Sequence, residues 1–227
     1  MAAASALVAG NVQAEVEYEI HTGYSSEYIF RGGDLGDNLF EVGLDASTEI
    51  AGLAVSAGAW SGFFESSGAT GNEIDAEVDL YAEVAKDFGF VTGAVGYIYY
   101  WNLGSLGDNF QEVYFSASRD LGFAQASLTY FWDVNGDNDG YTELALGRGF
   151  ALSECLTLNV GATLGYMIEQ TDFTALTGKV SLDWAFVENA KLSPFLAVSV
   201  PLSDVGGTYT EGSGNELFAG SMLSVAF

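Results

Sequence analysis

Carboxylates at every second position are the residues of this sequence best suited to do chemistry. In residues 73–84, acidic side chains alternate with aliphatic ones, and the acidic set is Glu73, Asp75, Glu77, Asp79 and Glu83. A β-strand sends alternate side chains to opposite faces, whereas a helix would spread both sets around its circumference. The pattern therefore predicts a strand with one acidic face and one apolar face.

The same alternation recurs along the chain, and it predicts a barrel whose apolar faces meet lipid and whose polar faces meet inside. The residues expected to line this interior are Arg31, Glu41, Asp45, Glu49, Asp75, Glu77, Asp79, Glu83, Glu112, Glu143, Lys179 and Asp183. Like charges this close repel strongly unless water or counter-ions screen them. A hydrated, cation-attracting pore is the functional interpretation. The alternative is a polar interior that is filled by side chains and conducts nothing.

Two positions in the first predicted strand carry other chemistry. Arg31 shares its parity with His21, so both are expected to point inward; Arg31 would form an ion-pair network with carboxylates, or else a constriction or ligand contact. His21 is the only histidine, and no spacing signature pairs it with Ser25 or Ser26 as a catalytic site. We therefore expect no enzymatic activity. Cys155, beside a tight turn, is expected to be inert.

One loop could hold a metal ion. Residues 133–140 place Asp133, Asn135, Asp137 and Asp139 at alternate positions before a glycine, a spacing that suits a hard cation such as calcium. The match to an EF-hand loop is incomplete, because the twelfth position counted from Asn135 is Leu146 instead of glutamate. Ordinary turn chemistry in an exposed hairpin is the alternative. No other cofactor is expected.

Composition limits the remaining possibilities. The 227 residues include 31 Asp+Glu against 6 Lys+Arg, giving a formal charge of −25, so we expect no binding to nucleic acid. A single cysteine excludes a disulfide framework. Residues 1–14 are small and apolar and end in Val12-Gln13-Ala14, which predicts the end of a secretory signal peptide, with a flexible N-terminus as the alternative. Residues 15–227 then form one domain.

The periodicity predicts twelve strands and no helix. They are expected at 16–31, 39–50, 53–64, 73–85, 90–101, 110–119, 123–133, 141–150, 156–167, 174–186, 192–202 and 216–227. Tight turns alternate with longer, Gly/Asn/Asp-rich loops such as 32–38 and 203–215. Short turns alternating with longer loops and an even number of strands are typical of a bacterial outer-membrane barrel. The predicted fold is therefore an all-β, antiparallel, up-and-down transmembrane barrel.

A soluble β-barrel or sandwich would show the same alternation with its apolar faces turned inward. Strand lengths of about 10–12 residues favour the membrane, because tilted strands of that length span a bilayer. Aromatic residues also gather at strand ends on the apolar parity, as two interfacial girdles would: Tyr28, Phe30, Tyr130, Trp132 and Tyr166 at one end, Trp184, Phe186 and Phe227 at the other. Finally, Leu223, Val225 and Phe227 resemble the C-terminal signal read by the outer-membrane assembly machinery.

Several stretches resemble the TorF family of small outer-membrane porins. Residues 24–32, Tyr-Ser-Ser-Glu-Tyr-Ile-Phe-Arg-Gly, are similar to that family's signature in its first strand. Residues 58–61 (Gly-Ala-Trp-Ser), 96–100 (Gly-Tyr-Ile-Tyr-Tyr) and 112–114 (Glu-Val-Tyr) are similar to segments of its third and middle strands. The chain departs from the family after Gly32, where Gly33-Asp34 replaces the usual Ser-Gln pair. The resemblance implies a porin of the outer membrane.

The sequence thus predicts an integral outer-membrane channel that passes small, cationic or neutral, hydrophilic solutes by diffusion. Its partners would be outer-membrane lipid, the assembly machinery and those solutes. The alternative is a non-conducting barrel whose loops contact the cell surface or other proteins. A lipid enzyme of the outer membrane is the third hypothesis.

Overall fold

The computed structural model describes residues 15–66, 73–104, 107–136, 140–203 and 214–227. These residues form twelve β-strands: β1 (Glu17–Phe30), β2 (Gly33–Ile50), β3 (Leu53–Ser66), β4 (Glu73–Asp87), β5 (Thr92–Leu103), β6 (Phe110–Asp120), β7 (Gln125–Asp133), β8 (Tyr141–Ser153), β9 (Leu156–Met167), β10 (Asp172–Val187), β11 (Ala190–Pro201) and β12 (Glu216–Ala226). In the described part of the chain, no helix is long and apolar enough to cross a membrane. The predicted all-β fold is confirmed.

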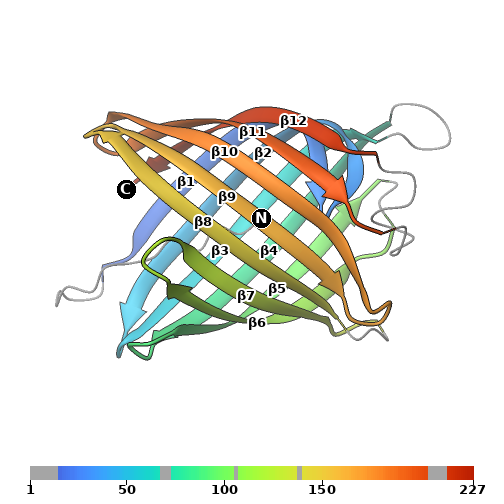
Figure 1. Cartoon of the computed structure of the whole chain (residues 1–227), viewed down its shortest axis with the longest axis horizontal. Coiled ribbons are helices and arrows are strands. Elements are labelled where there is room, and N and C mark those ends of the chain that lie inside the picture. The colour runs from blue at the N-terminus through green and yellow to red at the C-terminus, as the bar shows by residue number, and fades with distance from the viewer. Residues whose placement is uncertain (1–14, 67–72, 105–106, 137–139, 204–213) are drawn as a thin grey trace.

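The strands form one closed barrel in which each strand pairs antiparallel with its neighbours in sequence (Figure 1). The last strand closes the sheet against the first, with Ile20 opposite Val225. The backbone groups of Tyr18 and Phe227 exchange two hydrogen bonds, which extend this closure to the last residue. Closure leaves no open sheet edge, a condition for crossing a lipid bilayer with strands.

The outer face of the barrel is apolar. Leu44, Leu80 and Leu196 each keep at least half of their surface exposed on it. Trp132 and Trp184 also lie there, about half exposed and near strand ends, as the girdle prediction requires. A soluble barrel would bury such residues inside, so this surface identifies the bilayer as the surrounding medium.

The first hairpin differs from the prediction. Residues 32–38 were expected to form a loop, but β2 already begins at Gly33, and β1 and β2 are joined by the two residues Arg31 and Gly32. Both have positive φ, 53° and 89°. Two such residues make the tight turn whose twist matches a β-hairpin. The Gly/Asp-rich sequence after Gly32 resembles a loop, and for that reason its pairing could not be recognised from composition.

The pairing of β1 with β12 ends at Ser25, whereas its pairing with β2 continues to Phe30, so the end of the first hairpin leaves the barrel wall. On this part of the hairpin, Tyr28 packs against Phe64 and Phe30 against Tyr100, both of which are buried. The prediction that Tyr28 and Phe30 belong to the lipid-facing girdle is therefore wrong. Alternation assumes that a strand stays in the barrel wall along its whole length, and it cannot anticipate where a hairpin bends away from that wall.

Candidate functional site

The interior of the barrel is the candidate site, and its two ends differ. The tight turns lie at one end, together with Glu15 and Phe227, the first and last described residues, and we call it the turn end. The tip of the first hairpin lies toward the other end, the loop end. At the turn end, inward side chains remain accessible: the side chains of Lys191 and Asp45 are 44% and 36% exposed. Toward the loop end, Asp75, Glu77 and Glu112 are at most 4% exposed. The inward side chains are thus accessible at one end of the barrel and buried at the other.

The filling comes from the first hairpin, whose tip reaches the opposite wall of the barrel. Arg31 donates two hydrogen bonds to the Glu112 carboxylate on β6, of 2.8 and 2.6 Å. Gly32 abuts β10, where a Cβ placed on it would lie 2.2 Å from the Cβ of Ala175. Because β6 and β10 lie far from β1 and β2 around the closed sheet, these contacts show that the hairpin crosses the lumen.

Aromatic rings enclose the Arg31 guanidinium. Its central carbon lies 4.8 Å from the ring centre of Phe131 on β7 and 4.5 Å from that of Tyr141 on β8. Phe30, on the hairpin itself, supplies a third ring at 4.8 Å. The side chains of Arg31 and Glu112 are only 9% and 4% exposed. A cation against aromatic faces with a bidentate carboxylate is among the strongest arrangements for a guanidinium.

The flank of the hairpin covers the acidic row of β4. The Tyr28 hydroxyl donates to Glu77 over 3.2 Å, and the Tyr28 ring meets Phe64 at 4.9 Å between centres. Asp75 and Glu77 are 1% and 4% exposed. These residues do point inward, as the alternation predicts. They nevertheless lie beneath a hairpin instead of facing an open aqueous path.

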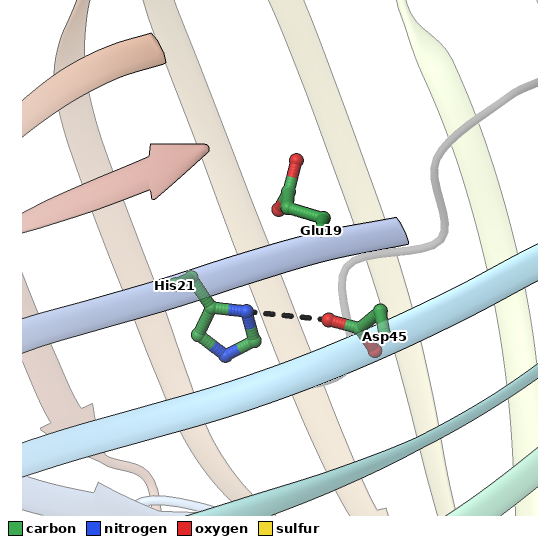
Figure 2. A group of neighbouring side chains, drawn as sticks. All are labelled: Glu19, His21 and Asp45. Carbon is green, nitrogen blue, oxygen red and sulfur yellow. Dashed lines mark ion pairs between the residues drawn. The ribbon is translucent and has the colours of Figure 1, made fainter. Parts of the chain in front are cut away.

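At the turn end, a histidine and two carboxylates meet (Figure 2). His21 Nδ1 lies 3.2 Å from Asp45 Oδ2, and the Tyr81 hydroxyl donates to Asp45 Oδ1 over 2.5 Å. Glu19 lies beside them, and one donor atom from each of Glu19, His21 and Asp45 falls within 4.8 Å of the others. Gly43 provides the room, because a Cβ there would lie 2.2 Å from His21 Nε2. His21 therefore acts in a polar network on the inner wall.

The remaining predicted interior residues lie on the same inner wall. Glu41 accepts a 2.7 Å hydrogen bond from the Trp60 indole, and Glu83 accepts one of 2.8 Å from the Tyr114 hydroxyl. Asp183 pairs with Lys191 at 3.5 Å.

Lys179 lies 4.1 Å above the Phe195 ring. Glu49, Asp79 and Glu143 share the inward parity of their strands β2, β4 and β8.

Several interior residues were missed by the sequence analysis. Lys191 lies on β11, one residue before the predicted start of that strand. The inward tyrosines Tyr81 and Tyr100 were missed because an aromatic residue on the polar parity carries no charge to mark it. Their hydroxyls donate to Asp45, two strands away on β2, and to Glu112, on the neighbouring strand β6, and neither contact is visible in the alternation alone.

The proposed calcium loop is only partly within the described residues. Asp133 Oδ1 accepts hydrogen bonds from the backbone of Asn135 and Gly136, 2.8 and 3.1 Å long. This is the turn chemistry that an Asp supplies at the end of a strand. Asp137 and Asp139 lie outside the described residues, so the calcium hypothesis stays a prediction.

Comparisons with known structures identify the architecture. The structure matches an outer membrane channel from Pseudomonas putida F1 with a TM-score of 0.61 and 14% sequence identity, over 96% of this chain and 97% of that one. It matches the KdgM porin with a TM-score of 0.54 and 14% identity, over 92% and 99%. The chain has the fold of a bacterial outer-membrane barrel.

The same fold also carries enzymes. The outer membrane phospholipase OMPLA of Salmonella typhi matches with a TM-score of 0.53 and 10% identity, over 93% of this chain and 90% of that one. At such identities the likeness establishes fold and not activity. No protein-family model matches the sequence, and neither does any of the curated proteins, so the resemblance to the TorF family stays a prediction.

Proposed function

We propose that this protein is a passive outer-membrane channel for small hydrophilic solutes, with a preference for cations. The observation that carries the proposal is the set of accessible, mostly acidic inward side chains at the turn end of the lumen. Its inward carboxylates are Glu19, Glu41, Asp45, Glu49, Glu83 and Asp183, and they face the cations Lys179 and Lys191. The wall is therefore negative on balance, and the likeness to channels and porins supports the same function.

Solutes would pass by diffusion, and the mechanism needs no chemical reaction. A fixed negative wall within a Debye length of the axis, about 8 Å at physiological ionic strength, enriches cations and repels anions. The hairpin narrows the path toward the loop end and sets the size of the solute. Selectivity then arises from charge along the wall together with steric exclusion at the constriction.

Planar bilayers test the proposal through the reversal potential under a KCl gradient. Replacing Glu41, Glu49 and Glu83 by glutamine should move that potential toward zero, because the three side chains keep their shape and lose their charge. Glu154→Gln is the matched control, since Glu154 lies in the exposed turn between β8 and β9, away from the inner wall. An equal shift in the control would show that surface charge, and not the pore wall, sets the preference.

A second candidate is favoured by the hairpin itself. A lumen crossed by a packed hairpin suits a barrel that conducts nothing and serves as a structural or interaction protein. The same bilayer experiment separates the two, because a non-conducting barrel stays silent after verified insertion. Release of the hairpin in a variant would then produce current where the native protein shows none.

A further inference from the structure

The residues around Arg31 have the arrangement of a binding site, and its occupant is a side chain of the protein itself. Glu112, Phe131 and Tyr141 lie on three consecutive strands of the wall, β6, β7 and β8, and we call them the arginine cage. Each of the three contacts the guanidinium of Arg31, at the distances given above. The guanidinium thus shows which ligand chemistry the cage recognises.

Residues of the wall contribute contacts that hold the cage in place. The Tyr100 hydroxyl on β5 donates to Glu112 Oε2 over 3.0 Å, which orients the carboxylate. Gly165 on β9 leaves room for Tyr141, because a Cβ there would lie 2.4 Å from the Tyr141 hydroxyl oxygen. Phe131 packs between Tyr114 and Tyr141 at 5.6 and 6.0 Å between ring centres. A site whose groups are positioned in advance loses little entropy when it binds.

The occupant sits on a tether that can be withdrawn. Arg31 lies at the tip of the two-residue turn between β1 and β2. Its side chain contacts β6, β7 and β8, which are distant from this hairpin in sequence and are not its neighbours in the sheet. Removing the guanidinium would leave a buried carboxylate without its counter-charge, a state that is costly unless another cation replaces it.

We propose that the arginine cage is a guanidinium-binding site of the channel, which Arg31 fills as a tethered ligand and from which a solute bearing a guanidinium group displaces it. Displacement frees the hairpin tip from the far wall and opens the path that it obstructs. The opening step rests on the proposed channel function, whereas binding to the cage does not. Guanidinium solutes would then be both the opener and the cargo of the pore.

The test begins with a variant that empties the cage and keeps the turn. Arg31→Asn creates an Asn-Gly pair, the favoured sequence for a two-residue turn with positive φ at both positions. Arg31→Gly is the second variant, should the first fail to fold, and heat-modifiable migration on gels reports folding for both. Calorimetric titration of the detergent-solubilised protein with methylguanidinium chloride should give a Kd on the order of 1 mM for Arg31→Asn. The wild type should bind at least about tenfold more weakly, because Arg31 competes.

Two controls locate the binding. Adding Glu112→Gln to Arg31→Asn should weaken the binding of methylguanidinium by about tenfold or more, because the charge-assisted bidentate pair is lost. Adding Glu154→Gln, the same change at an exposed carboxylate in the turn between β8 and β9, should leave the binding unchanged. Methylammonium should bind less well than methylguanidinium, because a point charge cannot form the planar pair. Absence of methylguanidinium binding to Arg31→Asn, or equal binding after Glu112→Gln, overturns the proposal.

Conductance separates the site from the channel. In bilayers, methylguanidinium should raise the open fraction of the wild type, and Arg31→Asn should be open without it. Binding with silence in every variant would overturn the proposed channel and leave the binding site standing. If Arg31→Asn binds methylguanidinium but the steady current of the wild type does not change when methylguanidinium is added, the opening step is overturned.

Discussion

At the scale of single residues, the bond between Arg31 and Glu112 matters most. The two charges are taken out of water and joined by two hydrogen bonds across the whole lumen. A buried pair of this kind contributes little over an apolar contact of the same shape, yet it is expensive to break from one side. Its value lies in fixing where the hairpin goes, since no other cation in the described structure bonds to Glu112.

Glu112→Gln tests this cost directly. The change leaves the Arg31 guanidinium buried against an uncharged amide and should lower the free energy of unfolding by about 3 kcal/mol. Urea titration in lipid vesicles, followed by tryptophan fluorescence, measures it. Glu83→Gln should change stability by much less, because Glu83 accepts one tyrosine hydrogen bond that glutamine can also accept. Equal effects of the two variants would show that the ion pair has no special role.

The parity of the charged residues could be predicted from the sequence, but the partner of each could not. Alternation places Arg31 and Glu112 on the same side of the sheet. It does not reveal that they touch, because 81 residues separate them and the contact depends on a hairpin bending inward. Nor can it show that Asp75 is buried while Lys179 remains accessible, since both have the same parity and differ only in what lies above them.

At the scale of elements, the first hairpin and the closing strand β12 matter most, because one enters the lumen and the other closes the barrel. Eleven of the twelve strands begin within two residues of the prediction, and β12 begins at the predicted residue. The exception with consequences is β2, whose early start at Gly33 converts a predicted loop into a hairpin inside the lumen. The length of a strand depends on the strand that pairs with it. Periodicity cannot reveal this pairing where the sequence of a strand does not alternate, as at the start of β2.

A designed disulfide tests the position of the hairpin. Gly32→Cys and Ala175→Cys, in a Cys155→Ala background, place two thiols where the Cβ atoms would meet after a small shift. Oxidation should join them in the membrane-inserted protein and give a faster-migrating band that reductant abolishes. Gly32→Cys paired with a cysteine at Ser127, on the inward face of β7 away from the tip, should not cross-link. Failure of the first pair, in a folded barrel, would contradict the inserted hairpin.

Phe227 tests the closing strand. Its backbone exchanges two hydrogen bonds with Tyr18, and its side chain is 69% exposed at the outer rim, so it packs against little in the protein itself. Deleting Phe227 should therefore reduce the amount in the outer membrane more than it reduces stability after refolding. Immunoblots of membrane fractions, with Phe227→Tyr as the aromatic control, compare the two effects. Normal outer-membrane levels after deletion would count against an assembly signal.

At the scale of the whole molecule, the barrel is asymmetric along its axis. Tight turns lie at one end together with the first and last described residues, and short turns of outer-membrane barrels face the periplasm. The end with accessible acidic side chains then faces the periplasm, and the hairpin lies toward the cell exterior. An epitope inserted after Gly136, in the exposed connection between β7 and β8, should be labelled on intact cells. Labelling that requires permeabilised cells would reverse the orientation.

The central claim is that the acidic interior makes this barrel a cation-preferring channel, and the reversal potential of the wild-type protein tests it most directly. Under a tenfold KCl gradient, the potential should take the sign for potassium and should shrink as the mean salt concentration rises, because ions screen the wall. A potential of the sign for chloride, or silence from barrels shown to be folded and inserted, would contradict the account.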